Sequence, residues 1–203
     1  MYKYIAIIAI HISFFCFSME QKTPYITLPT NNPGIVGLFD FSPQTAGPMK
    51  ELAQTLLRTN ASENFSAADR ELIATYVSFL NECNFCYQSH AAIARHLSEN
   101  NKSVITDLIN DKIDTASISP KLKSLLHIAG RVQQSGRAVT LEDIHQAKAH
   151  GADDTEIHDT VLIAAFFCMN NRYVDGLKAL TPSDYTLYDT RGKITAQNGY
   201  IQK

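Results

Sequence analysis

Two cysteines and a histidine stand close together near the middle of the 203-residue chain, at the spacing C-x-x-C-x-x-x-H. On a helix that advances about 100° per residue, Cys83, Cys86 and His90 share one face. Cys83 follows a break in the helical pattern, so we expect it at the start of a helix, where the helix dipole lowers a thiol pKa and favours the thiolate. His90 follows Cys86 by four residues, close enough to exchange a proton with its sulfur. The pattern indicates a redox-active dithiol with a neighbouring base.

Three interpretations of this cluster compete. Packed thiols beside a buried histidine are the plainest, but two cysteines at this spacing with a histidine on their face make that interpretation weak. A structural zinc site has three plausible ligands here, whereas such a site usually needs four, and the chain offers no second C-x-x-C or H-x-x-x-H. A c-type haem is excluded because Tyr87, not histidine, follows Cys86. We favour the redox pair, with no metal or cofactor, and keep a non-catalytic helical oligomer with structural zinc as the alternative.

The first residues differ from the rest of the chain. Residues 1–20 contain a single early Lys3, an apolar stretch from Tyr4 to Phe17 and then polar residues. This pattern is typical of a signal peptide and is short for a membrane span. We predict an exported protein, periplasmic or secreted, with an uncleaved N-terminal anchor as the alternative.

The composition excludes some classes of protein. The net charge is only −2 and the basic residues are scattered, so nucleic acid is not an expected partner. If residues 1–20 are removed, the cysteines that remain are Cys83, Cys86 and Cys168. Three cysteines do not make the disulfide framework of a small secreted domain, so the close pair must be explained by its own chemistry.

The remaining chain has a helical pattern. Residues 21–48 contain five of the seven prolines and predict an extended or turning lead-in. Residues 49–182 show helical apolar spacing without strand alternation, which predicts an all-α domain of about seven helices. Residues 183–203 form a polar, tyrosine-containing tail that we expect on the surface or against a neighbouring subunit. Helix starts are predicted at Ser66 with Asp69, Ser119 with Pro120, and Thr140 with Asp143.

A glutamate outside the cluster extends the motif. Glu71 precedes Cys83 by twelve residues, and this combination resembles the carboxymuconolactone decarboxylase superfamily, in its peroxidase-related branch of proteins similar to the alkyl hydroperoxide reductase component AhpD. The resemblance covers most of residues 34–180. One departure is Phe85, because AhpD proper has a histidine between the two cysteines. Segments similar to the family occur in family order at residues 34–58, 66–92, 119–129 and 159–177.

The resemblance implies a compact, all-helical AhpD-like domain with the C-x-x-C at a helix N-terminus, assembled into trimers or hexamers. It implies a thiol-dependent peroxidase of the peroxiredoxin type, in which Cys86 attacks a hydroperoxide, Cys83 resolves the product, and His90 with Glu71 relays protons. An external dithiol of the thioredoxin or lipoyl type would reduce the enzyme again. A thiol-disulfide reductase acting on a protein partner is an alternative.

Two points remain open on the residues themselves. The helix start favours Cys83 as the more acidic thiol, whereas the neighbouring His90 favours Cys86. Glu71 has a plain alternative role, since an acid in the first turn of a helix interacts well with the dipole.

Overall fold

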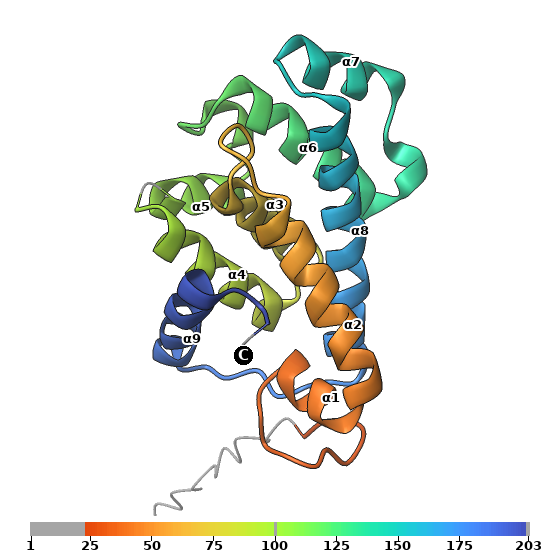
Figure 1. Ribbon diagram of the computed structural model, residues 1–203, viewed down its shortest axis with the longest axis vertical. Coiled ribbons are helices and arrows are strands. Elements are labelled where there is room, and N and C mark those ends of the chain that lie inside the picture. The colour runs from red at the N-terminus through yellow and green to blue at the C-terminus, as the bar shows by residue number, and fades with distance from the viewer. Residues whose placement is uncertain (1–22, 100, 202–203) are drawn as a thin grey trace, which may run out of the picture.

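The computed structural model describes residues 23–99 and 101–201, and every regular element within these ranges is helical (Figure 1). The all-α prediction is confirmed. The predicted signal peptide or anchor, residues 1–20, lies outside the described residues. The α-helices are α1 (Ile35–Phe41), α2 (Pro43–Gln54), α3 (Ala67–Leu80), α4 (Asn84–Leu97), α5 (Asn101–Ile109), α6 (Pro120–Gln134), α7 (Leu141–Ala149), α8 (Asp154–Gly176) and α9 (Tyr185–Asn198).

Short helical turns of other types join some of these helices: the π-helical turn Thr55–Thr59 continues α2, and 3₁₀ turns lie at Ile113–Thr115 and Gly136–Ala138. Of the helices in the described part of the chain, none is both long and apolar enough to cross a membrane.

The predicted helix starts are confirmed by their capping hydrogen bonds. The Ser66 and Thr140 hydroxyls accept the amides of Asp69 and Asp143, and each of these aspartates returns a bond to the backbone of its cap. Ser119 accepts the amide of Leu122, and Pro120 is the first residue of α6. Each cap satisfies backbone donors that a helix start leaves unpaired.

The predicted lead-in over residues 21–48 is wrong for its second half, because α1 and α2 lie there. The prolines of this stretch do not all break helices. Pro43 is the first residue of α2, where a missing N–H has no cost and the fixed φ suits a helix, and the helix continues through Pro48. The helical domain therefore begins at Ile35 rather than at Met49.

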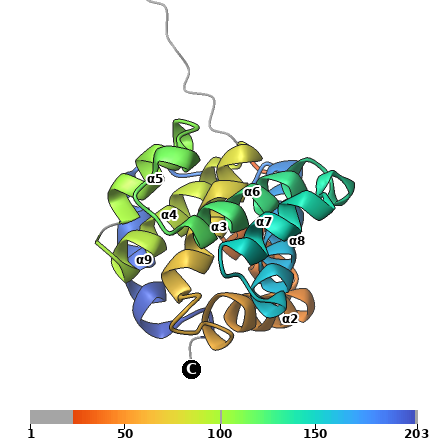
Figure 2. The same ribbon diagram turned by 90° about the horizontal axis from the view of Figure 1, so that it is seen from above.

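α3 lies at the centre of the bundle and positions the site (Figure 2). It packs against α4 on one side and against α6 and α8 on the other. The apolar side chains between α3, α6 and α8 form the main core, and they include Leu72, Ile73, Val77, Leu125, Leu126, Ile128, Ile163, Phe166 and Phe167.

A buried ion pair holds the π-helical turn against this core. The Arg70 guanidinium donates to the Asp159 carboxylate at 2.8 Å and to the backbone carbonyls of Leu56 and Asn60 at 2.7 and 2.8 Å. Both charged side chains are 2% exposed. Since a buried charge needs partners of this kind, Arg70 ties α3, α8 and the end of the π-helical turn to one another.

The polar tail contains a helix that the sequence pattern did not reveal. α9 packs along α4 of the same chain, as both views show (Figures 1 and 2). Gly192 faces Ala92 at the crossing, and a Cβ on Gly192 would lie 2.7 Å from the Ala92 Cβ and 2.9 Å from its backbone carbon. Glycine usually weakens a helix, but here its missing side chain allows the two helices to approach closely.

This close approach predicts the effect of adding one methyl group. We expect Gly192→Ala to lower the free energy of unfolding by about 1–3 kcal/mol, because the new Cβ overpacks against the backbone of α4. Gly176→Ala is the matched control, since nothing lies within 4 Å of the position of its Cβ. Urea unfolding of both variants measures the effect, and a Gly192→Ala protein as stable as the wild type would contradict this packing.

Candidate active site

The turn between α3 and α4 sets the positions of the two sulfurs. Asn81 ends α3, Glu82 adopts a positive φ of 58°, and Cys83 is the N-cap residue of α4. Cys86 is the third residue of α4, and the two cysteines, both free, approach within 3.1 Å. A dithiol at this separation needs little movement to form a disulfide.

The two thiols lie in different environments. Cys83 is fully buried, and its pKa is raised because its thiol hydrogen-bonds to Cys86, because it is buried, and because the charge of Asp175 lies nearby. Cys86 is 4% exposed and lines a pocket, whereas Cys83 does not. The helix start therefore does not lower the pKa of Cys83, since the hydrogen bond to Cys86 and burial outweigh the dipole. Cys86 is the sulfur that a small molecule can reach.

Glu71 lies at the centre of the polar part of the site. Its side chain is completely buried, and three donors converge on its carboxylate. His90 Nδ1 lies 2.8 Å from Oε2, the Tyr200 hydroxyl donates to Oε1 at 2.6 Å, and Arg58 Nη2 lies 3.2 Å from Oε1. When Nδ1 carries the proton that it donates to Glu71, His90 Nε2 has the free lone pair. Glu71 thus selects the histidine tautomer that can accept a proton at Nε2.

The alternative role of Glu71 as a helix-dipole partner is not supported. Glu71 is the fifth residue of α3, beyond the first turn, and Ser66 with Asp69 already caps the helix. Its partners come from α4, from the π-helical turn and from the segment after α9. The carboxylate therefore binds side chains of the site and not the end of its own helix.

Aromatic rings fix the orientation of the His90 imidazole. The Phe167 ring of α8 meets it edge-on with centroids 4.5 Å apart, and the Tyr200 ring stacks on it at 6.2 Å with an interplanar angle of 21°.

The pKa of Tyr200 is raised well above its ordinary value by burial and by the charge of Glu71, so its hydroxyl stays a proton donor.

The sequence did not identify Tyr200 or Arg58 as site residues. Tyr200 is 129 positions after Glu71, in a tail without apolar periodicity. Arg58 lies near the end of a helical segment, where an arginine side chain is usually solvated. One local signal precedes Tyr200, namely Gly199, which has a positive φ of 75° and ends α9. A glycine before an isolated tyrosine is too frequent a pattern to indicate a site.

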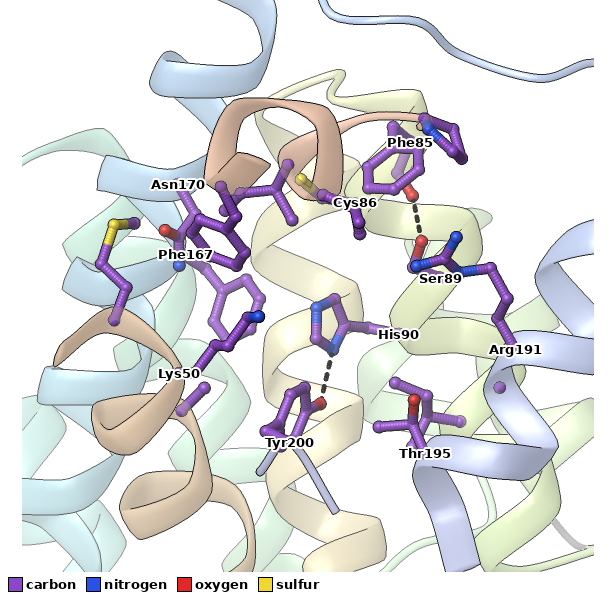
Figure 3. Close-up of a pocket in the computed structure, with 18 of the residues that line it drawn as sticks. Lys50, Phe85, Cys86, Ser89, His90, Phe167, Asn170, Arg191, Thr195 and Tyr200 are labelled. Atoms are coloured by element: carbon purple, nitrogen blue, oxygen red, sulfur yellow. Dashed lines mark hydrogen bonds between the residues drawn. The ribbon is translucent and has the colours of Figure 1, made fainter. Parts of the chain in front are cut away.

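A pocket of about 460 Å³ opens beside Cys86 and His90 (Figure 3). Most of its lining is apolar, and two exposed cations, Lys50 and Arg191, extend into it from opposite sides of the imidazole. α1, α2, α4, α8, α9 and the segment after α9 all contribute residues to its wall. The apolar lining residues include Ile35, Phe39, Met49, Phe85, Ile93, Phe167, Leu187 and Tyr188.

Phe85, the residue between the two cysteines, forms part of this wall. Its ring packs on Tyr188 with centroids 5.8 Å apart, and it covers Gly34, where any Cβ would collide with the ring. Gly34 in turn donates its amide to the Leu180 carbonyl at 2.7 Å. At the position where AhpD proper has a histidine, this chain thus has an apolar contact that closes the site.

Metal binding has no geometric support within residues 23–99 and 101–201, because no group of three or more histidine, cysteine, aspartate or glutamate side chains is arranged to hold an ion. His90 Nδ1 is already engaged by Glu71. The zinc alternative therefore has less support than the dithiol.

Fold and site together define a helical protein with a dithiol beside a buried histidine–glutamate pair, and comparison with known proteins agrees with this class. Residues 43–106 match the model of the carboxymuconolactone decarboxylase family, a stretch that contains Glu71, both cysteines and His90. A search of curated proteins gave no significant match.

Two solved structures share the fold. One is an alkylhydroperoxidase AhpD core, an uncharacterized peroxidase-related protein from Ralstonia eutropha JMP134, with a TM-score of 0.67 and 22% identity over 79% of this chain and 81% of that one. The other, an uncharacterized peroxidase-related protein from Silicibacter sp. TM1040, has the same TM-score and identity over 79% and 80% of the two chains. The family match supports the resemblance to this superfamily, and the two structures show that the chain shares the fold of these proteins.

The different environments of the thiols predict their order of reaction. In the reduced protein we expect iodoacetamide to modify Cys86 before Cys83, because Cys86 lines the pocket and only a thiolate reacts. Each unit by which the pKa of Cys83 is raised lowers its thiolate fraction about tenfold at neutral pH. Peptide mass spectrometry after limited alkylation measures the order, with the half-buried Cys168 as an internal reference. Faster modification of Cys83 would contradict the assignment.

Proposed function

We propose that this chain is a thiol-dependent peroxidase that reduces an organic hydroperoxide through a Cys83/Cys86 dithiol–disulfide cycle. One arrangement carries the proposal: Cys86 lines an apolar pocket beside His90, a second thiol lies within 3.1 Å, and His90 is hydrogen-bonded to a fully buried glutamate. The solved relatives, which are called peroxidase-related proteins, support the same chemistry.

The first step oxidises Cys86. His90 accepts the thiol proton at Nε2, and the Cys86 thiolate attacks the outer oxygen of the hydroperoxide. The O–O bond breaks, Cys86 becomes a sulfenic acid, and the alkoxide leaves with the proton that His90 returns, so that one alcohol is formed. Glu71 holds Nδ1 and balances the positive charge on the imidazole during the transfer.

The second step consumes the neighbouring thiol. Cys83 attacks the sulfenic sulfur, which releases water and leaves a Cys83–Cys86 disulfide. An external dithiol of the thioredoxin or lipoyl type then reduces this disulfide by thiol–disulfide exchange and is itself oxidised. The raised pKa of Cys83 suits the resolving role, because this thiol remains protonated until Cys86 has reacted.

The pocket supports an organic hydroperoxide as the substrate. Its volume of about 460 Å³ falls in the range of small-molecule sites and far exceeds the space that hydrogen peroxide needs. The aromatic and aliphatic walls favour an apolar substituent, since each buried CH₂ group contributes about 0.8 kcal/mol.

Exchange of single sulfurs for oxygens tests the cycle. We expect Cys86→Ser to abolish turnover of cumene hydroperoxide in the presence of dithiothreitol, because the attacking sulfur is lost. Cys83→Ser should react once and accumulate a sulfenic acid that dimedone traps. Peroxide consumption, followed spectroscopically, and protein mass report the two results.

Cys168→Ser is the matched control, because Cys168 lies on α8 outside the pocket lining and accepts only a weak hydrogen bond from Asn81 at 3.6 Å. This variant should turn over like the wild type. Unchanged peroxide consumption by Cys86→Ser would contradict the proposed function.

We further propose that the chain forms a homo-oligomer, a trimer or hexamer, through α8. Leu162, Ala165 and Met169 are exposed at helical spacing on that helix, and Leu162 and Met169 are 36% and 48% exposed. A stripe of exposed apolar side chains on a helix that otherwise belongs to the core is a typical contact between protomers.

Charge placed on this stripe should dissociate the assembly. We expect Met169→Lys to reduce the mass measured by light scattering to that of one chain, because a lysine at the contact must be buried without a partner. Leu141→Lys, at a 70% exposed leucine on α7, is the control and should leave the mass unchanged. A monomeric wild-type protein would contradict the oligomer.

A further inference from the structure

The segment after α9 returns to the centre of the molecule. α9 ends at Asn198, and the positive φ of Gly199 turns the chain inward. The Tyr200 amide then donates to Gln54 Oε1 of α2 at 2.8 Å. A backbone hydrogen bond to α2 thus fixes the position of Tyr200 relative to the site, independently of its side chain.

The Tyr200 side chain touches every charged member of the buried centre. Its hydroxyl lies 2.6 Å from Glu71 Oε1 and 3.3 Å from His90 Nδ1, as the close-up shows for the histidine (Figure 3). The guanidinium of Arg58 lies over its ring at 5.6 Å. An apolar ring would fill the same space without a hydroxyl. The hydroxyl beside the carboxylate is therefore more than packing requires.

We propose that Tyr200 is a positioning residue for the His90–Glu71 pair, and that this segment is therefore part of the active centre. This role rests on the peroxidase function proposed above. The Tyr200 hydroxyl holds Oε1, which leaves Oε2 directed at His90 Nδ1 and fixes the imidazole tautomer with Nε2 free for the proton of Cys86. Tyr200 acts through Glu71 and His90 and does not itself touch the reacting sulfur.

The same contact sets how strongly Glu71 attracts a proton on His90. The hydroxyl of Tyr200 takes up part of the negative charge on the carboxylate. When the hydroxyl is removed, more of that charge acts on His90 and attracts the positively charged imidazole more strongly. The charged or titratable groups around His90 come from several elements: Glu71 of α3, Cys86 of α4, Arg58 of the π-helical turn, Lys50 of α2, Arg191 of α9 and Tyr200 itself. Phe167 of α8 adds no charge.

Removal of one oxygen atom tests this role. We expect Tyr200→Phe to shift to higher pH the inflection that His90 gives to the pH profile of Cys86 alkylation by iodoacetamide. We also expect kcat/KM for cumene hydroperoxide to fall by up to about a hundredfold, the lower end of what general acid–base catalysis contributes. Tyr185→Phe is the control, because Tyr185 lies on α9 outside the pocket lining and its ring packs under Arg95; its profile should match the wild type.

Two further measurements keep the outcome decisive. Urea unfolding shows whether Tyr200→Phe is folded, and a second variant that ends after Gly199 removes the side chain while α9 is kept. An unshifted alkylation profile in either folded variant overturns the role of Tyr200. Alkylation needs no peroxide and therefore tests the role of Tyr200 separately from the peroxidase function. A wild-type protein that fails to consume hydroperoxide contradicts the peroxidase function and leaves the alkylation result unaffected.

Discussion

A carboxylate that is completely buried must be surrounded by hydrogen-bond donors, and Glu71 is such a carboxylate. Its need for donors determines which segments of the molecule must meet at α3. Burial of the Glu71 carboxylate costs free energy unless each of its oxygens has a hydrogen-bond partner. The partners are Arg58 of the π-helical turn, His90 of α4 and Tyr200 of the segment after α9. Three segments that are far apart in the sequence therefore converge on one side chain of the central helix. The packing of α9 on α4 and the ion pair of Arg70 both hold these segments where the carboxylate needs them.

Arg58 is the positively charged partner of Glu71, and its guanidinium is only partly hydrogen-bonded. Its Nε and Nη1 atoms are buried and have no hydrogen-bond partner among the described residues, a deficit that costs about 1–3 kcal/mol per group. A guanidinium selected only for packing would be poorly placed here. Beside Glu71 it offsets part of the carboxylate charge, which moderates the attraction of the pair for a proton on His90. The site thus contains unpaired donors beside a carboxylate whose charge Arg58 partly offsets.

The sequence predicted the members of the site whose types and spacing form a motif, and it missed Arg58 and Tyr200, whose positions carry no such signal. The glutamate, both cysteines and the histidine fall within one helix–turn–helix, so their spacing alone brings them to one place. Tyr200 follows a helix that has no apolar periodicity and packs on α4 with a glycine at the crossing, so the sequence pattern does not reveal it. The order of the two thiols stayed open on the residues alone, because the place of Cys83 at a helix start was visible in the sequence whereas its complete burial was not. Ser42 and Pro43 begin a helix as Ser119 and Pro120 do, but the other prolines and glycines around them hid this signal.

α9 connects the two halves of the proposed chemistry. The helix lines the pocket with Leu187, Tyr188 and Arg191, and it leads directly into Tyr200 beside the buried pair. The close approach of Gly192 to Ala92 fixes the place of this helix against α4, which carries Cys86 and His90. In the proposed function, α9 is therefore the structural link between the pocket that takes the substrate and the buried pair that moves the proton.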